Sequence, residues 1–124
     1  MSRMPELVVD TDDGPRLVGG YSATSGHHHF PLNAVCPFTG ADDVERVLLP
    51  ATGTLWGWTA VTAPPPGYEG PVPYGFGVVE LDGAAMRVVT RLTESDPTAL
   101  AAGQPMRLVV EPIGDLDVWA FTPA

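Results

Sequence analysis

The 124-residue sequence contains no lysine and only six arginines, against fifteen Asp and Glu, so its formal net charge is −9. A chain with this charge does not attract a phosphate backbone, which argues against nucleic-acid binding. A basic start followed by a signal-length apolar stretch is also missing, and no window reaches the roughly 18 apolar residues of a membrane span. We therefore expect a cytoplasmic protein that does not bind a membrane.

Cysteine is almost absent too, because Cys36 is the one cysteine of the chain. It cannot form an internal disulfide, which fits a reducing compartment. Glycine and proline, by contrast, are abundant, with 14 of each. Since neither is periodic and 44% of the residues are apolar, this excess indicates many turns between short strands. We expect one all-β or β-rich domain with a single core.

Residues 50–124 carry the clearest strand signals. Asp82-Gly83 is a typical hairpin turn, Gly53 and Gly57 permit bulges, and a capping residue followed by Pro97 predicts a short helix over 95–100. The predicted strands are 55–62, 74–81, 86–92, 106–111 and 118–121, with a turn at Gly114-Asp115 before the last. Five short strands suit a closed five-stranded barrel of the OB type, and a small open sandwich is the alternative.

Residues 16–49 contain two turns with the spacing of metal-binding knuckles. The first is Ser22-x-x-Ser25-Gly26 and the second is Cys36-x-x-Thr39-Gly40. A zinc ribbon has Cys-x-x-Cys at both places, whereas here three of the four positions carry hydroxyls, which are poor zinc ligands. We predict that no zinc is bound, and that hydrogen bonds from the hydroxyls and an obligate partner replace it.

Histidines next to the first knuckle leave a second metal hypothesis open. His27, His28 and His29 follow Gly26, and His27 and His29 with Cys36 form a fallback ligand set. The same residues are the only support for Cys36 as a nucleophile, which would require a base and an electropositive pocket.

Ahead of the knuckles, residues 1–15 are acidic and weakly patterned. We interpret them as an arm that ends in a turn and is mobile or bound to a partner. A further acidic group, Asp42, Asp43 and Glu45, is interpreted as a solvated turn or a helix start.

An ordered set of short motifs resembles a known family over roughly residues 15–123. The family comprises stand-alone proteins in which a rubredoxin-like zinc ribbon precedes an OB-fold and which accompany thiolase-fold enzymes. Besides the two knuckles with Phe30-Pro31 between them, the motifs are Arg16-Leu17-Val18-Gly19-Gly20, Gly53-Thr54-Leu55-Trp56-Gly57-Trp58-Thr59, Pro64-Pro65-Pro66-Gly67-Tyr68, Pro73-Tyr74, Val79-Glu80-Leu81-Asp82-Gly83, Gly103-Gln104-Pro105-Met106-Arg107 and Trp119-Ala120-Phe121-Thr122-Pro123. The sequence departs from the family at the zinc ligands.

The resemblance implies a non-catalytic accessory subunit of acyl-CoA metabolism. Its partner would be a thiolase or a thiolase-like (lipid-transfer-protein-like) aldolase, including those of steroid side-chain degradation, in a hetero-oligomer that shares acyl-CoA as substrate. In agreement, no Ser-His-Asp spacing or phosphate-binding Gly-rich loop occurs in the sequence. An OB-fold that binds single-stranded nucleic acid and a small His/Cys metal-binding enzyme remain as alternatives.

Site residues follow from this reading. The predicted partner-binding residues are apolar: Phe30, Val35, Phe38, Trp56 and Trp58. Trp56 and Trp58 share a face if their strand is regular. Arg87 and Arg91 are four residues apart on one predicted strand and are the candidates for CoA binding, with an ion pair to Glu80 or Glu94 as the simpler alternative.

Overall fold

The computed structural model describes residues 7–63, 65–68, 70–114 and 116–124. In this part of the chain the only helix is a single 3-10 turn, η1 (Pro97–Ala99), and none is long and apolar enough to cross a bilayer. The strands are β1 (Val8–Thr11), β2 (Gly14–Ser22), β3 (His27–His29), β4 (Val44–Leu48), β5 (Thr52–Val61), β6 (Tyr74–Leu81), β7 (Arg87–Leu92), β8 (Pro105–Ile113) and β9 (Leu116–Pro123).

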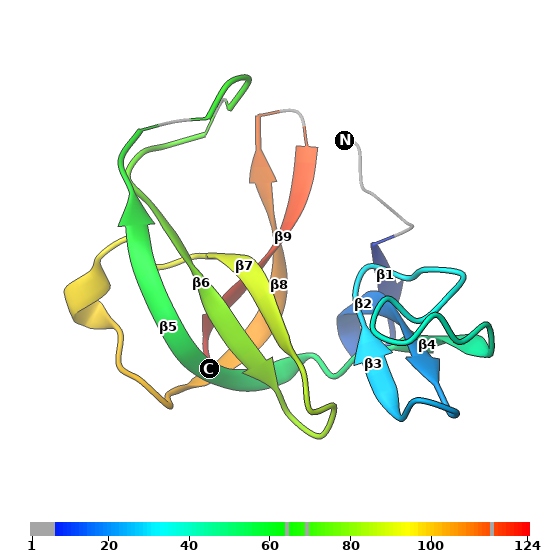
Figure 1. Ribbon diagram of the computed structural model, residues 1–124. Helices are drawn as coiled ribbons and strands as arrows, with labels where there is room; N and C mark the ends of the chain where they lie inside the picture. Colours follow the sequence, from blue (N-terminus) through cyan, green and yellow to red (C-terminus); the bar gives the residue numbers. More distant parts are fainter. Residues whose placement is uncertain (1–6, 64, 69, 115) are drawn as a thin grey trace.

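The second half of the chain is a closed barrel with the strand order β5-β6-β7-β9-β8 (Figure 1). All pairs are antiparallel except β7 with β9, where Leu92 lies opposite Phe121. Buried and more exposed residues alternate along β6 and β7, so one face of each strand points into the interior of the closed barrel. The predicted all-β fold with a five-stranded OB barrel is confirmed.

The predicted strands of the barrel agree with the observed ones to within a few residues. The turn at Asp82-Gly83 joins β6 to β7, with Gly83 at φ 78°, where glycine is favoured. The predicted helix is reduced to η1, which begins after Asp96, whose side chain accepts a hydrogen bond from the Thr98 N–H. Asp115 of the predicted turn and Pro64 of the proline-rich loop lie outside the described residues.

A bulge interrupts the regular pairing of β5. The register shifts between Leu55 and Gly57, so that Leu55 lies opposite Val79 but Gly57 lies opposite Val78. Because a shift by one residue exchanges the two faces of a strand, Trp56 is exposed while Trp58 packs against the core. The strand is thus not regular, the bulge that Gly57 was expected to permit is present, and the two tryptophans do not share a face.

The first half of the chain is a small sheet beside the barrel (Figure 1). β2 is its centre, since it pairs with β1 through its first half and with β3 and β4 through its second half. Residues 8–15, expected to be part of an arm, instead form a hairpin in which Val8 lies opposite Leu17. The arm interpretation is wrong for these residues, and residues 1–6 lie outside the described part.

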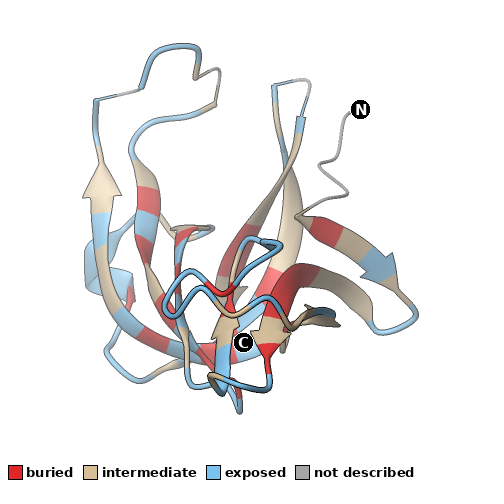
Figure 2. Ribbon diagram, turned by 45° about the vertical axis from the view of Figure 1, so that its right-hand side comes forward, coloured by how far each residue is buried: buried red, intermediate tan, exposed pale blue. Residues whose placement is uncertain are grey.

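The sheet and the barrel share one hydrophobic core. Val8, Leu17 and Leu49 belong to the same buried cluster as barrel residues such as Leu55 and Phe121, and Figure 2 shows buried segments on β2 as well as on the barrel strands. A close backbone approach helps to form the sheet, because a Cβ on Gly19 would lie 2.6 Å from the His29 carbonyl oxygen. The ribbon-like segment is thus attached to the barrel by packing as well as by the chain.

Polar contacts support the same junction. Arg16, at the start of the family-like motif, donates from Nε to the Leu49 carbonyl at 2.6 Å and from Nη2 to the Leu48 carbonyl at 3.2 Å. The carbonyls of the last residue of β4 and of the residue after it therefore accept hydrogen bonds from a charged donor. The Leu108 N–H of β8 donates a hydrogen bond to the Ala51 carbonyl at 2.7 Å, which ties the segment after β4 to the barrel.

Candidate functional site

The two knuckles contact each other although three of the four positions carry hydroxyls and not thiols. Ser25 Oγ donates a hydrogen bond to Cys36 Sγ at 3.3 Å, which joins the first knuckle to the second. This hydrogen bond, followed by one from Thr39, lowers the pKa of the buried Cys36 thiol from 9.0 to about 7. The predicted hydroxyl contacts to backbone are also present, since Ser22 Oγ accepts from the Ser25 N–H at 3.3 Å and Thr39 Oγ1 from the Ala41 N–H at 3.3 Å.

Asp43, the residue before β4, binds the first knuckle through its carboxylate. Its carboxylate accepts Ser22 Oγ–H at 2.5 Å and both the N–H and the Oγ–H of Thr24 at 2.8 Å. These donors, Ser22 first, lower the pKa of Asp43 from 3.8 to about 2. The expected helix start is wrong, because β4 begins at the next residue, Val44. Asp42 is exposed in a bend, in agreement with the solvated turn, whereas Asp43 is bonded to the first knuckle and Glu45 is exposed on β4.

The residues at the knuckles do not fit a ribbon zinc. One thiol and three hydroxyls are not a zinc donor set, and one of those hydroxyls, Ser22 Oγ–H, already donates to Asp43. Within the described ranges, no group of three or more His, Cys, Asp or Glu side chains is placed to hold a metal. The fallback ligands His27, His29 and Cys36 are therefore not assembled into such a group. The metal content of the purified protein stays a prediction.

The histidines instead make separate contacts. The rings of His27 and Phe38 lie 5.1 Å apart, and those of His28 and Tyr21 lie 4.6 Å apart. His29 is buried, and its Nε2 accepts the Asn33 N–H at 3.1 Å.

The five apolar residues predicted to bind a partner divide into two groups. Val35, Phe38 and Trp56 are exposed, with Phe38 at 66% the most exposed large hydrophobic residue of the described chain. Phe30 and Trp58 face inward: the Phe30 ring meets Trp119 edge-on at 5.5 Å, and Trp58 Nε1 donates to the Pro97 carbonyl at 2.9 Å. The sequence reasoning missed Leu32, which is 39% exposed in the same loop as Val35 and Phe38.

Both candidate CoA-binding arginines lie on β7 and are engaged in ion pairs. Arg87 contacts Glu80 at 3.1 Å, as the simpler alternative anticipated, and lies 4.3 Å from the centre of the Trp56 ring. Arg91 pairs with Glu111 of β8, with 2.6 Å from its Nε to Oε1. Their role in CoA binding stays a prediction.

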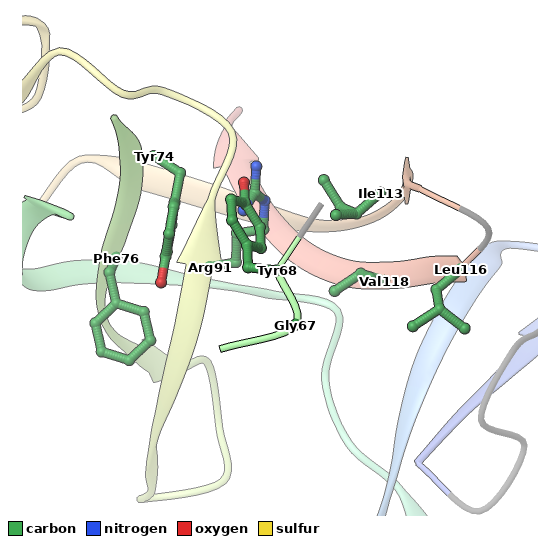
Figure 3. Close-up of a pocket in the computed structure, with 8 residues that line it drawn as sticks. All are labelled: Gly67, Tyr68, Tyr74, Phe76, Arg91, Ile113, Leu116 and Val118. Carbon is green, nitrogen blue, oxygen red and sulfur yellow. The ribbon is translucent and has the colours of Figure 1, made fainter. Parts of the chain in front are cut away.

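A pocket of about 570 Å³ lies at one end of the barrel, and the sequence analysis did not identify it. It opens between the loop that joins β5 to β6 and the β8–β9 hairpin, with aromatic side chains and Arg91 on one side and aliphatic side chains on the other (Figure 3). Its lining residues are Gly67, Tyr68, Tyr74, Phe76, Arg91, Ile113, Leu116 and Val118. The aromatic residues around the proline-rich loop were the available signal.

Comparisons with known proteins agree with this architecture. The family model of the ChsH2 C-terminal OB-fold domain matches residues 46–111. A DUF35 domain-containing scaffold protein of Pyrococcus furiosus is 31% identical over 102 residues, which cover 82% of this chain and 74% of the relative.

A solved structure, described as an Ltp2-ChsH2(DUF35) aldolase, superposes with a TM-score of 0.69 at 28% identity. The match covers 87% of this chain and 84% of that chain, so it includes the small sheet as well as the barrel. The resemblance found in the sequence is thereby confirmed, and the chain belongs to the DUF35 family of ChsH2-type OB-fold proteins.

Proposed function

We propose that this protein is a non-catalytic accessory subunit that binds a thiolase-fold enzyme. The observation that carries the proposal is the match to a chain of the Ltp2-ChsH2(DUF35) aldolase over most of both chains. The scaffold role named for the Pyrococcus relative supports the same conclusion. Catalysis then resides in the partner, which would be a thiolase or a thiolase-like acyl-CoA aldolase, including those that act on steroid side chains.

An exposed apolar loop supports partner binding. Leu32, Val35 and Phe38, which we name the knuckle patch, are all at least 39% exposed within seven residues of an acidic chain. Exposed apolar side chains that are clustered in this way are typical of protein contacts. Burial of the knuckle patch by a partner would also stabilise a segment that has one thiol in place of four.

The finer features of the proposal concern substrate and compartment. We propose that the complex works in the cytoplasm, where a reduced Cys36 is expected. We also propose that the subunit supports the stability of the partner or shapes the access of its acyl-CoA substrate. Arg87, on the outer face of the barrel, is the candidate for a contact with CoA phosphates in that complex.

Co-expression with a thiolase-fold enzyme encoded beside this gene tests the proposal. We expect one complex on size-exclusion chromatography, thiolase or retro-aldol activity of the complex, and no activity of the lone chain. The double variant Val35→Asp and Phe38→Asp should dissociate from the partner, because it places unpaired charges in an apolar contact. Val72→Asp is the matched control, since Val72 is a 44% exposed valine outside both the knuckle patch and β7, the strand that carries Arg87.

One outcome would overturn the accessory-subunit proposal, and another would overturn its docking site. One is cleavage of a CoA thioester by the lone chain. The other is full recovery of an active complex with the double variant, which would remove the knuckle patch as the docking site.

A further inference from the structure

We propose that the pocket at the end of the barrel binds an uncharged planar ring system and discriminates against anions. Its volume of about 570 Å³ lies within the range of roughly 300 to 1,000 Å³ that is typical of small-molecule sites. The inference concerns the chain by itself and does not depend on the proposed enzyme partner.

Aromatic rings provide one side of the pocket. Tyr68 comes from the β5–β6 loop and Tyr74 from the start of β6, with ring centres 5.0 Å apart and an angle of 42° between the rings. Phe76 follows on the same face of β6 and is 39% exposed. Figure 3 shows the three rings along the edge of the pocket. Exposed ring faces favour a ligand that stacks.

Aliphatic side chains provide the opposite side. Ile113 is the last residue of β8, and Leu116 and Val118 belong to β9, so the hairpin holds all three against the aromatic side (Figure 3). None of the three can donate or accept a hydrogen bond, and a flat ligand between the two sides would bury mainly carbon.

Arg91 is the one cation among the described lining residues, and its charge is already compensated. Its Nε lies 2.6 Å from Glu111, and its Nη1 donates to Tyr68 Oη at 3.0 Å. Its guanidinium carbon lies 4.9 Å from the centre of the Tyr74 ring and 5.7 Å from that of Tyr68. The side chain is only 14% exposed, so Arg91 holds the aromatic side in place and is not free to attract an anion.

Two polar side chains of the site, Tyr68 and Arg91, already have protein partners without a ligand. Tyr68 Oη accepts from Arg91 and donates to the Pro71 carbonyl at 2.6 Å, so its donor and an acceptor are in use. A phosphate or carboxylate would therefore have to share Arg91 with the Glu111 carboxylate, on a chain that already carries a net charge of −9. Burial of a second anion beside that carboxylate is unfavourable.

Two dyes that share one ring system test the charge preference directly. N-phenylnaphthylamine is uncharged, and anilinonaphthalene sulfonate adds one negative charge to the same rings. In fluorescence titrations of the full chain, we expect the neutral dye to bind about tenfold or more tightly than the anionic dye. Adenosine monophosphate, which carries a ring and a phosphate, should not displace the neutral dye.

Two variants locate the binding and its cause. Leu116→Asp places a charge on an exposed position of the hairpin and should weaken binding of the neutral dye by about tenfold. Val35→Asp, at an equally exposed position outside the pocket lining, is the control and should not change that binding. Glu111→Gln keeps an acceptor for Arg91 but removes the compensating charge. The Glu111→Gln protein should bind the anionic dye more tightly than the unaltered protein does. The difference in affinity between the neutral and the anionic dye should therefore become smaller or change sign.

The inference is overturned if the two dyes bind equally well, if the neutral dye does not bind, if Leu116→Asp binds it unchanged, or if adenosine monophosphate displaces it. If Glu111→Gln binds the anionic dye as weakly as the unaltered protein does, then the Glu111 charge is not what disfavours anions. Failure in any of these assays leaves co-purification with a thiolase-fold enzyme untouched, so the two proposals fail separately.

Discussion

The barrel and the small sheet before it maintain their folds by different means. In the barrel, continuous strand pairing closes on itself and alternate side chains fill the interior, so the backbone and the core suffice. In the small sheet, β3 has only three residues, and the knuckles next to it depend on side-chain hydrogen bonds from Ser22, Ser25 and Asp43. The barrel is therefore held by backbone pairing and core packing, whereas the knuckles of the small sheet are held by side-chain hydrogen bonds as well.

Replacement of the three knuckle hydroxyls by thiols should produce the largest change in zinc binding and in stability. The triple variant Ser22→Cys, Ser25→Cys and Thr39→Cys gives four cysteines at positions whose side chains already approach one another. We expect it to bind one zinc per chain, with a stabilisation on the order of 10 kcal/mol as in small zinc-dependent folds. Elemental analysis after mild chelation checks this.

The unaltered protein, purified without a metal-affinity column, is the control and should carry far less than one zinc. Stoichiometric zinc in the unaltered protein would contradict the contrast between the two regions. Absence of zinc from the triple variant would show that the four positions do not converge.

A comparison of two buried leucines tests whether the regions share a core. Leu17 lies in β2 and Leu55 in β5, and both are at most 1% exposed. Replacement of either by alanine should lower the free energy of unfolding by about 2 to 5 kcal/mol in a single transition. Urea unfolding followed by both circular dichroism and tryptophan fluorescence measures this. Separate transitions for the two signals would mean that the regions fold independently.

Replacement of Asp43 by asparagine should lower the stability of the protein by a smaller amount, which depends on pH. The pKa of Asp43 is about 2 in the folded protein against an ordinary 3.8, so its stabilising effect is complete above about pH 4 and disappears as the pH falls toward 2. We expect Asp43→Asn to lower the melting temperature at pH 7 and to melt close to the unaltered protein near pH 2. Equal differences at both pH values would show that the carboxylate charge is unimportant for the knuckle.

Single-stranded DNA should have the smallest effect. The OB barrel is a common nucleic-acid fold, but the net charge of −9 opposes phosphate binding. We expect no appreciable change in fluorescence anisotropy of a labelled oligonucleotide at physiological salt. Micromolar binding would favour the nucleic-acid alternative over the accessory subunit.

Local signals predicted the barrel well. Asp82-Gly83 marks a turn by its own chemistry, and the apolar alternation around Val79 and Val88 specifies which face is buried. The role of Asp43 was not predictable in the same way, because its partners Ser22 and Thr24 lie about twenty residues earlier and meet it only after β2 pairs with β4. The pocket likewise depends on two loops brought together by barrel closure.

The bulge in β5 gives the protein an internal optical reporter. It turns Trp58 inward, whereas Trp56 stays 58% exposed and in contact with the Arg87 guanidinium; Trp58 and Trp119 are both partly buried. The emission of Trp56 should therefore lie at longer wavelength than that of the other two and be the most accessible to a quencher such as acrylamide. A molecule that covers the outer face of the barrel would shield Trp56 selectively, so a change in quenching would identify that face without an added label.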